Sequence, residues 1–200
     1  MGGGQVPSGG RAGPWQGVPM TDVMTLGRLA TERAGDRPDL LAPPVVSALQ
    51  TFSDGVWVAP IDPDLADTAA FCAAYDVPAA ASANCVVVTG RRAGEQRWAA
   101  AVVLATTRAD VNGVVRRRMD VRKVSFAAMA DAVAITGMQF GGITPIGLPA
   151  GWPILIDAAV AAAGPVVIGS GIRASKIVID GAALDGLPGA EVLQGLAIPG

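Results

Sequence analysis

The sequence predicts a domain of the α+β class. Short runs rich in Val and Ile, which read as strands, outnumber the stretches long enough for crossover helices. Two of these runs, 84–89 and 97–105, are joined by a turn-rich segment of seven residues, which is typical of an antiparallel hairpin. Because strand and helix do not alternate regularly, a parallel α/β sheet is not expected.

The domain organisation follows from composition. Residues 1–19 are rich in Gly and Pro without apolar periodicity, which predicts a disordered tail. Residues 20–200 are predicted to form a single domain, because this length and the hydrophobic content of 51% suffice for one core. The chain lacks a signal-peptide pattern and an apolar run of membrane-span length, and its two cysteines lie in apolar segments, so a cytoplasmic location is expected.

The residues before position 80 predict three helical segments and one strand. Apolar spacing predicts a helix over 25–34, and a pair of prolines begins a second short helix at residue 43. The residue pattern of Val56-Trp57-Val58-Ala59 predicts a strand over 56–59. Asp62 is expected to cap a helix that runs to Tyr75.

The hairpin is followed by two more predicted helices. Asp110 is expected to cap a helix that ends at Arg118, and after a short strand over 122–124 a helix over 127–136 is closed by Gly137. The remaining predicted elements are strands over 154–156, 166–168, 177–179 and 190–192, a helical turn capped by Asp157, and a short helix over 180–187.

The chain contains no histidine, which excludes several classes of catalytic site. Neither a Ser-His-Asp nor a Cys-His nucleophile can form, nor can a zinc site of the usual Cys and His type. Three acids, Asp62, Asp64 and Asp67, lie close together, but helix capping accounts for all of them. No metal and no cofactor are therefore expected.

Residues 137–149 contain four glycines and two prolines between two apolar stretches. Glycine lets backbone approach a ligand closely and proline stiffens the turn, so this loop is predicted to form the floor of a ligand site. The alternative is a structural crossover whose glycines serve only tight turns. A second short turn, Gly169-Ser170-Gly171, could add backbone N–H groups as an anion-binding nest.

The basic residues are concentrated in one part of the chain. Between Arg91 and Lys123 stand nine basic residues and three acids, and residues 116–118 are the densest part of this segment. Such a segment is either a surface for nucleic-acid phosphate or a solvated helix face.

The order of residues from Gly141 to Pro145 resembles the Gly-x-x-x-Pro loop of the YbaK family, the prolyl-tRNA-synthetase-associated editing domains. Further segments follow the family order: 83–88, 98–106, 121–124 with the helix that closes at Gly137, 153–157 and 169–173. The resemblance therefore covers roughly residues 40 to 197. It implies a mixed, strongly curved sheet that forms a partial barrel with helices packed outside. It also implies hydrolysis of the ester of a mischarged tRNA, whose 3′-terminal adenosine and aminoacyl group bind beside the loop.

The resemblance also implies site residues. Active members carry a lysine where this chain has Asn84, and asparagine cannot supply a positive charge. The available replacements for that charge are Lys123, Arg173 and Lys176, each of which is also compatible with a surface position. The expected catalytic residues are Asn84, Gly141 and Gly142; the expected substrate-binding residues are Ile143, Thr144, Pro145, Gly147, Asp157, Gly169, Ser170, Gly171 and Arg173; the expected tRNA contacts are Arg116, Arg117, Arg118, Arg122 and Lys123.

Three functions remain open on the sequence. The first is an aminoacyl-tRNA deacylase acting in trans, weakened or re-tuned by Asn84. The second is a catalytically silent binder of aminoacyl-tRNA or of a ligand resembling aminoacyl-adenosine. The third is a scaffold for a protein partner. Aminoacyl-tRNA is the expected substrate or ligand, and an aminoacyl-tRNA synthetase is a further candidate partner.

Overall fold

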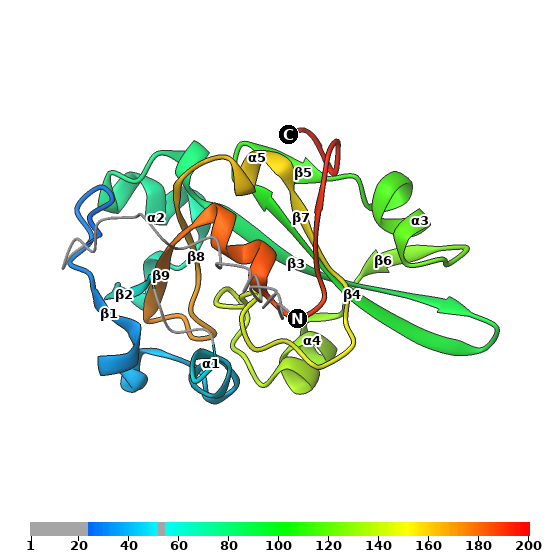
Figure 1. Cartoon of the computed structure of the whole chain (residues 1–200), viewed down its shortest axis with the longest axis horizontal. Helices are drawn as coiled ribbons and strands as arrows, with labels where there is room; N and C mark the ends of the chain where they lie inside the picture. The colour runs from blue at the N-terminus through cyan, green and yellow to red at the C-terminus, as the bar shows by residue number, and fades with distance from the viewer. Residues whose placement is uncertain (1–23, 52–54) are drawn as a thin grey trace, which may run out of the picture.

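The computed structural model describes residues 24–51 and 55–200 (Figure 1). The predicted tail, residues 1–19, lies outside these ranges. No helix within the described residues is long and apolar enough to cross a membrane.

The larger sheet has five strands in the order β10-β7-β4-β3-β6. Its bounds are β3 Ala83–Arg92, β4 Glu95–Leu104, β6 Val124–Phe126, β7 Ile154–Asp157 and β10 Ala190–Leu193. The long hairpin of β3 and β4 is antiparallel, whereas β7 runs parallel to both β4 and β10. The sheet is therefore mixed.

The smaller sheet has four antiparallel strands in the order β1-β2-β9-β8. Its bounds are β1 Glu32–Arg33, β2 Val56–Pro60, β8 Pro165–Gly169 and β9 Ser175–Asp180. A single bridge from Ser82 to Val167 connects the start of β3 with β8, so the two sheets meet at this point without closing a full barrel. The α+β prediction and the partial barrel are both confirmed. A separate pair is formed by β5 Thr107–Ala109 and β11 Ala197–Pro199.

Short helices surround these sheets. The α-helices are α1 Pro43–Leu49, α2 Thr68–Tyr75, α3 Arg116–Arg118, α4 Met129–Thr136 and α5 Ala158–Ala161. A π-helical segment, η5 Val111–Val115, leads into α3, and the 3-10 turns are η1 Ala34–Asp36, η2 Pro38–Leu40, η3 Pro63–Leu65, η4 Ala79–Ala81 and η6 Gly181–Gly186. Several of these helices end as expected. The side chains of Asp110 and Asp157 cap η5 and α5, and the left-handed backbone of Gly137, at φ 66°, ends α4.

Strand β9 shows how the core forms on both faces of the smaller sheet. Successive side chains of a strand point to opposite faces, so Ile177 and Ile179 enter the main core while Val178 packs with Phe71 of α2. Fully burying one such side chain contributes about 1.5 to 3 kcal/mol. Helix α2 is thereby held against the sheet, and its N-terminus is fixed near the junction of the two sheets.

The helix predicted over 25–34 is wrong. Gly27 has φ 59° in a turn, and Glu32 and Arg33 pair with Val58 and Trp57 of β2. Pairing with a distant strand supplies backbone hydrogen bonds that outweigh a weak local helix preference.

Two other boundaries differ from the prediction. The helix expected from Asp62 to Tyr75 is divided, because Asp62 caps η3 and Asp67 begins α2 as a second cap. The strand expected over 122–124 lies at 124–126, where it pairs with β3.

Candidate functional site

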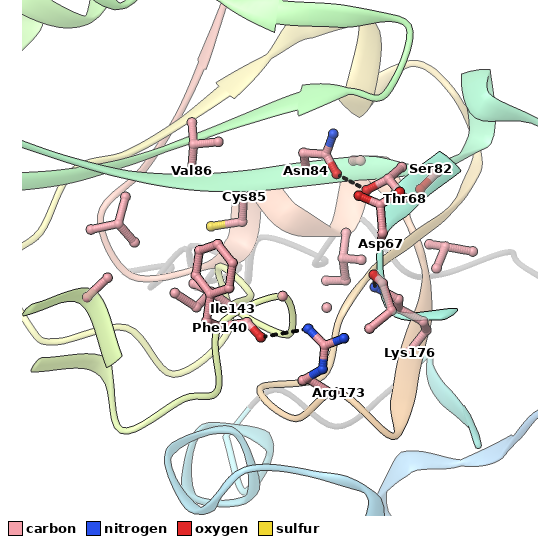
Figure 2. Close-up of a pocket in the computed structure, with 18 of the residues that line it drawn as sticks. Asp67, Thr68, Ser82, Asn84, Cys85, Val86, Phe140, Ile143, Arg173 and Lys176 are labelled. Atoms are coloured by element: carbon pink, nitrogen blue, oxygen red, sulfur yellow. Dashed lines mark hydrogen bonds between the residues drawn. The ribbon is translucent and has the colours of Figure 1, made fainter. Parts of the chain in front are cut away.

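A cavity of about 530 Å³ lies where the two sheets meet (Figure 2). Its walls come from the N-terminus of α2, the start of β3, the β6–α4 segment, the 137–149 loop and the adjoining ends of β8 and β9. Segments distant in sequence therefore converge on one site. The volume falls within the range of about 300 to 1,000 Å³ found for small-molecule sites.

One end of the cavity carries a polar pair. The Thr68 hydroxyl donates a 2.7 Å hydrogen bond to Oδ1 of Asn84, which stands near the start of β3. Figure 2 shows Asn84 and Cys85 on opposite sides of β3, as strand alternation requires. The NH₂ group of Asn84 has no partner among the described residues, and in Figure 2 it points away from Cys85 and the interior of the cavity.

Lys176 of β9 is a cation in the cavity wall, and only 7% of its surface is exposed. Its Nζ donates to the Ala66 carbonyl at 3.1 Å and lies 5.3 Å from the centre of the Phe71 ring. Burial lowers the pKa of Lys176 and nearby Arg173 lowers it further, while Cys72 and Asp67 act in the opposite direction. The carboxylate of Asp67 accepts from the Ala69 and Ala70 N–H groups of α2.

Arg173 is the second cation of the wall. Its guanidinium donates to the Pro63 carbonyl at 2.8 Å and to the Phe140 carbonyl at 3.4 Å, and its backbone N–H donates to Oε1 of Gln139 at 2.8 Å. These bonds join the 137–149 loop to η3 and to the β8–β9 turn. Arg173 therefore positions the loop.

Gly142 of the loop and Gly169 at the end of β8 allow a close contact between two backbones. A methyl group on Gly142 would lie 2.5 Å from the Ile172 carbonyl oxygen, and one on Gly169 would lie 2.5 Å from the Ile143 carbonyl oxygen. The Gly171 N–H donates to the Gly142 carbonyl at 2.7 Å across the same contact. The loop and the β8–β9 turn thus approach more closely than any side chain would allow.

Gly141 is the loop glycine that reaches the cavity itself. It has φ +84°, and a methyl group there would lie 2.7 Å from Nη1 of Arg173. Within the part of the chain that the structure describes, the backbone N–H groups of Gly141 and Ile143 meet no acceptor. Both are available as donors to a ligand.

The interior of the cavity is apolar, and so is its rim. Cys85, Val87, Ile143, Val167 and Ile168 are among the interior residues. Burial raises the pKa of Cys85 to about 12, so its thiol stays neutral and is not a nucleophile at neutral pH.

Three large apolar side chains at the rim face solvent. Phe126, Met129 and Phe140 are 64%, 56% and 55% exposed, and each also lines the cavity. Exposed aromatic side chains beside a cavity are suited to stacking against a planar ligand group.

The structure brings together some of the expected site residues. Those lining the cavity are Asn84, Gly141, Ile143, Gly169 and Arg173, and those outside its lining are Gly142, Thr144, Pro145, Gly147, Asp157, Ser170 and Gly171. Several of the second group have internal contacts: Asp157 accepts from the Ala159 and Ala197 N–H groups, and the buried Ser170 hydroxyl contacts that of Ser175. The Thr144 hydroxyl is buried and has no hydrogen-bond partner among the residues that the structure describes.

The expected tRNA contacts lie apart from the cavity. In Figure 1, α3 is at one end of the molecule, whereas α2, β8 and β9 are at the other. Arg118 pairs with Glu191, and Nε of Arg116 donates to the Asn112 carbonyl at 2.8 Å. The five expected tRNA contacts do not line the cavity: Arg116, Arg117, Arg118, Arg122 and Lys123.

Sequence reasoning named Lys176 only as one of three possible substitutes for the missing lysine, and it missed the aromatic rim. Lys176 directly precedes the apolar run 177–179, and it lies inside β9 because that strand begins two residues earlier than expected. No local pattern marks Phe126 or Phe140, because their exposure depends on how α4 and the loop pack. Among the described residues no three His, Cys, Asp or Glu side chains gather as a metal site.

The arrangement of sheets is that of a known fold. One solved structure, of a proposed trans-editing enzyme for prolyl tRNA synthetase, is 20% identical with a TM-score of 0.66 and covers 80% of this chain and 99% of its own. A hypothetical protein, APE2540, is 17% identical with a TM-score of 0.68 and covers 78% and 99%. A structure from work on grafting epitopes onto scaffold proteins is 21% identical with a TM-score of 0.67 and covers 80% and 97%.

The sequence places the chain in a family. A model of the aminoacyl-tRNA editing domain matches residues 62–187, which is more than half of the chain. The protein belongs to the aminoacyl-tRNA editing domain family, and the resemblance to YbaK is confirmed. A search of curated proteins found no match.

Proposed function

We propose that this protein hydrolyses the ester of mischarged aminoacyl-tRNA in trans. The observation that carries the proposal is the cavity within the residues that match the editing domain, because it combines free backbone donors, an apolar interior and a cationic wall. The acyl group would enter the interior beside Ile143. The terminal adenosine would lie against the exposed rings of Phe126 and Phe140.

The chemistry assigns the attack to water. The chain has no histidine, and the thiol of Cys85 is neutral. The oxygen of a water molecule bonds to the ester carbon, the bond from that carbon to the ribose oxygen breaks, and the proton released by the water passes to the ribose oxygen. The products are a free amino acid and an uncharged tRNA. The N–H groups of Gly141 and Ile143 would hold the acyl group during this step.

The basic segment would extend the contact along the tRNA. Arg116, Arg117 and Arg118 supply charge for phosphate without reading sequence. In this proposal the cavity recognises the aminoacyl end and α3 contributes affinity for the backbone. A cytoplasmic protein associated with translation fidelity fits both roles.

The test is a deacylation screen of the full chain over a panel of mischarged tRNAs. We expect release of amino acid from at least one of them, at a rate that falls in a Gly141→Ala variant whose added methyl group crowds Arg173. Absence of hydrolysis across the panel would refute the proposal.

A second candidate function is a catalytically silent binder, and one observation favours it. Asn84 is neutral, and its oxygen is already bonded to Thr68, so it supplies no positive charge at the start of β3. Under this alternative the wild type would bind a non-hydrolysable aminoacyl-adenosine analogue without cleaving esters, and only an Asn84→Lys variant would gain activity.

A further inference from the structure

We infer that Lys176 is the catalytic cation of this cavity and that its ammonium group hydrogen-bonds the ester carbonyl oxygen of the substrate during hydrolysis. The inference rests on the deacylase function proposed above. It assigns the charge to β9 instead of the start of β3, and it selects Lys176 from the three substitutes that the sequence offered.

The first step of the argument is burial. Lys176 is 7% exposed and directly precedes the fully buried residues Ile177 and Val178 in β9. An ammonium group taken out of water is costly unless it is paired, and among the described residues Lys176 forms no ion pair with an acid. A methionine would fill the same space without this cost. A costly charge in the wall of a cavity is a mark of a functional site.

The second step is the number of donors still available. An ammonium group has three N–H donors, and the described residues accept one of them, at the Ala66 carbonyl. The ring of Phe71 lies 5.3 Å from Nζ and favours the charged form without accepting a conventional hydrogen bond. Two donors therefore remain for a group that enters the cavity.

The third step is the comparison with the other polar groups of the wall. Arg173 already donates to the Pro63 and Phe140 carbonyls and so positions the loop. Asn84 carries no charge and lies at the edge of the cavity. Among the described residues Arg173 uses two of its five N–H donors and keeps the others, but it is only half-buried. Lys176 is the cation of the lining that is almost fully buried and still has free donors.

The role of Lys176 follows from the reaction. When water adds to the ester carbon, negative charge develops on the carbonyl oxygen, and it is lost again when the bond to the ribose oxygen breaks. The ammonium group stabilises that charge and keeps its own protons throughout. Removal of one such donor typically lowers kcat by about 10²- to 10³-fold.

The experiment compares Lys176→Met and Lys176→Ala with the wild type in single-turnover deacylation. Arg28→Gln serves as a matched control, because Arg28 is an exposed cation paired with Asp76 outside the cavity. We expect both Lys176 variants to lose about 10²- to 10³-fold in rate. Added ethylammonium should restore part of the rate of Lys176→Ala, because it fits the vacated space, whereas tetramethylammonium, which has no N–H donor, should not.

Circular dichroism and thermal unfolding of each variant accompany the rates. A purely structural lysine predicts that Lys176→Met, which keeps the packing, retains activity and that amines do not rescue Lys176→Ala. Equal rates for the wild type and Lys176→Met would overturn the inference alone. A wild type that hydrolyses none of the mischarged tRNAs would instead overturn the deacylase function on which the inference rests.

Discussion

The contact between the 137–149 loop and the β8–β9 turn can be tested with one methyl group. In a Gly169→Ala variant the new Cβ would lie 2.5 Å from the Ile143 carbonyl oxygen and closer still to that of Gly142. Ordinary contact requires 3.4 Å or more, so the two backbones must separate by about 1 Å. Both partners are main-chain atoms, so no side chain can rotate to relieve the overlap.

The expected cost comes from this separation. Overpacking of this kind destabilises by about 1 to 3 kcal/mol, which for a chain of this size lowers Tm by roughly 2 to 12 °C. The displacement also moves Gly141 and Ile143 away from the substrate, and a misplacement of about 1 Å can cost on the order of 10²-fold in rate. Gly169→Ala should therefore remain folded while losing most of its deacylation activity.

Differential scanning calorimetry and single-turnover deacylation measure the two effects. Gly35→Ala is the control, because no heavy atom lies within 4 Å of the added Cβ and Gly35 does not have a positive φ. Its Tm and rate should match those of the wild type. If Gly169→Ala also behaves like the wild type, the two loops are not in the tight contact described, and the account of the loop glycines is refuted.

Three further predictions address the rim, the basic segment and the buried lysine. Phe140→Ala should weaken binding of an aminoacyl-adenosine analogue by about 1 to 3 kcal/mol in calorimetric titration, with no change in Tm, because the ring is 55% exposed; unchanged affinity would remove it from the site. Replacing Arg116, Arg117 and Arg118 by alanine should weaken binding of all tRNAs alike and reduce the salt dependence of binding, whereas an unaltered salt slope would identify a solvated helix face. The free energy of unfolding of the wild type, measured with urea, should rise relative to that of Lys176→Met as the pH increases toward 10.5. The pKa of Lys176 is lowered in the folded state, so the unfolded chain binds the proton more tightly. The cost of burying the charge is therefore present at neutral pH and is relieved as the pH rises through the folded-state pKa. A constant difference across this range would show that burial does not perturb the lysine.

Local interactions explain which parts of the fold the sequence determined. The hairpin of β3 and β4, the Asp157 cap and the end of α4 at Gly137 each depend on residues that are close in sequence. Capping groups and glycine conformations act over one helical turn, so a pattern of a few residues is enough to specify them. The Gly-x-x-x-Pro pattern of residues 141–145, together with the ordered segments around it, was also enough to indicate the editing-domain family.

Contacts between distant segments decided the rest of the fold. The stretch 25–34 has a helical pattern, but pairing with β2 places Glu32 and Arg33 in a strand. The division of the segment from Asp62 to Tyr75 is different, because it depends on a local signal that the prediction overlooked: Asp67 caps a second start within it. Local preferences of a few tenths of a kcal/mol are easily outweighed by strand pairing and packing.

The site likewise contains residues that the sequence identified and residues that only the tertiary structure placed. The sequence alone identified the 137–149 loop and placed Asn84, Gly141 and Arg173 in it or beside it, and these line the cavity. It could not show that Gly142 and Gly147 meet backbone instead of ligand, because those contacts come from the β8–β9 turn and from Pro44. Nor could it place Lys176 in the cavity wall, since whether a lysine is solvated or buried depends on the helix that covers its strand. Here α2 covers β9, and the tertiary structure alone turns one charged residue beside an apolar run into a candidate catalytic group.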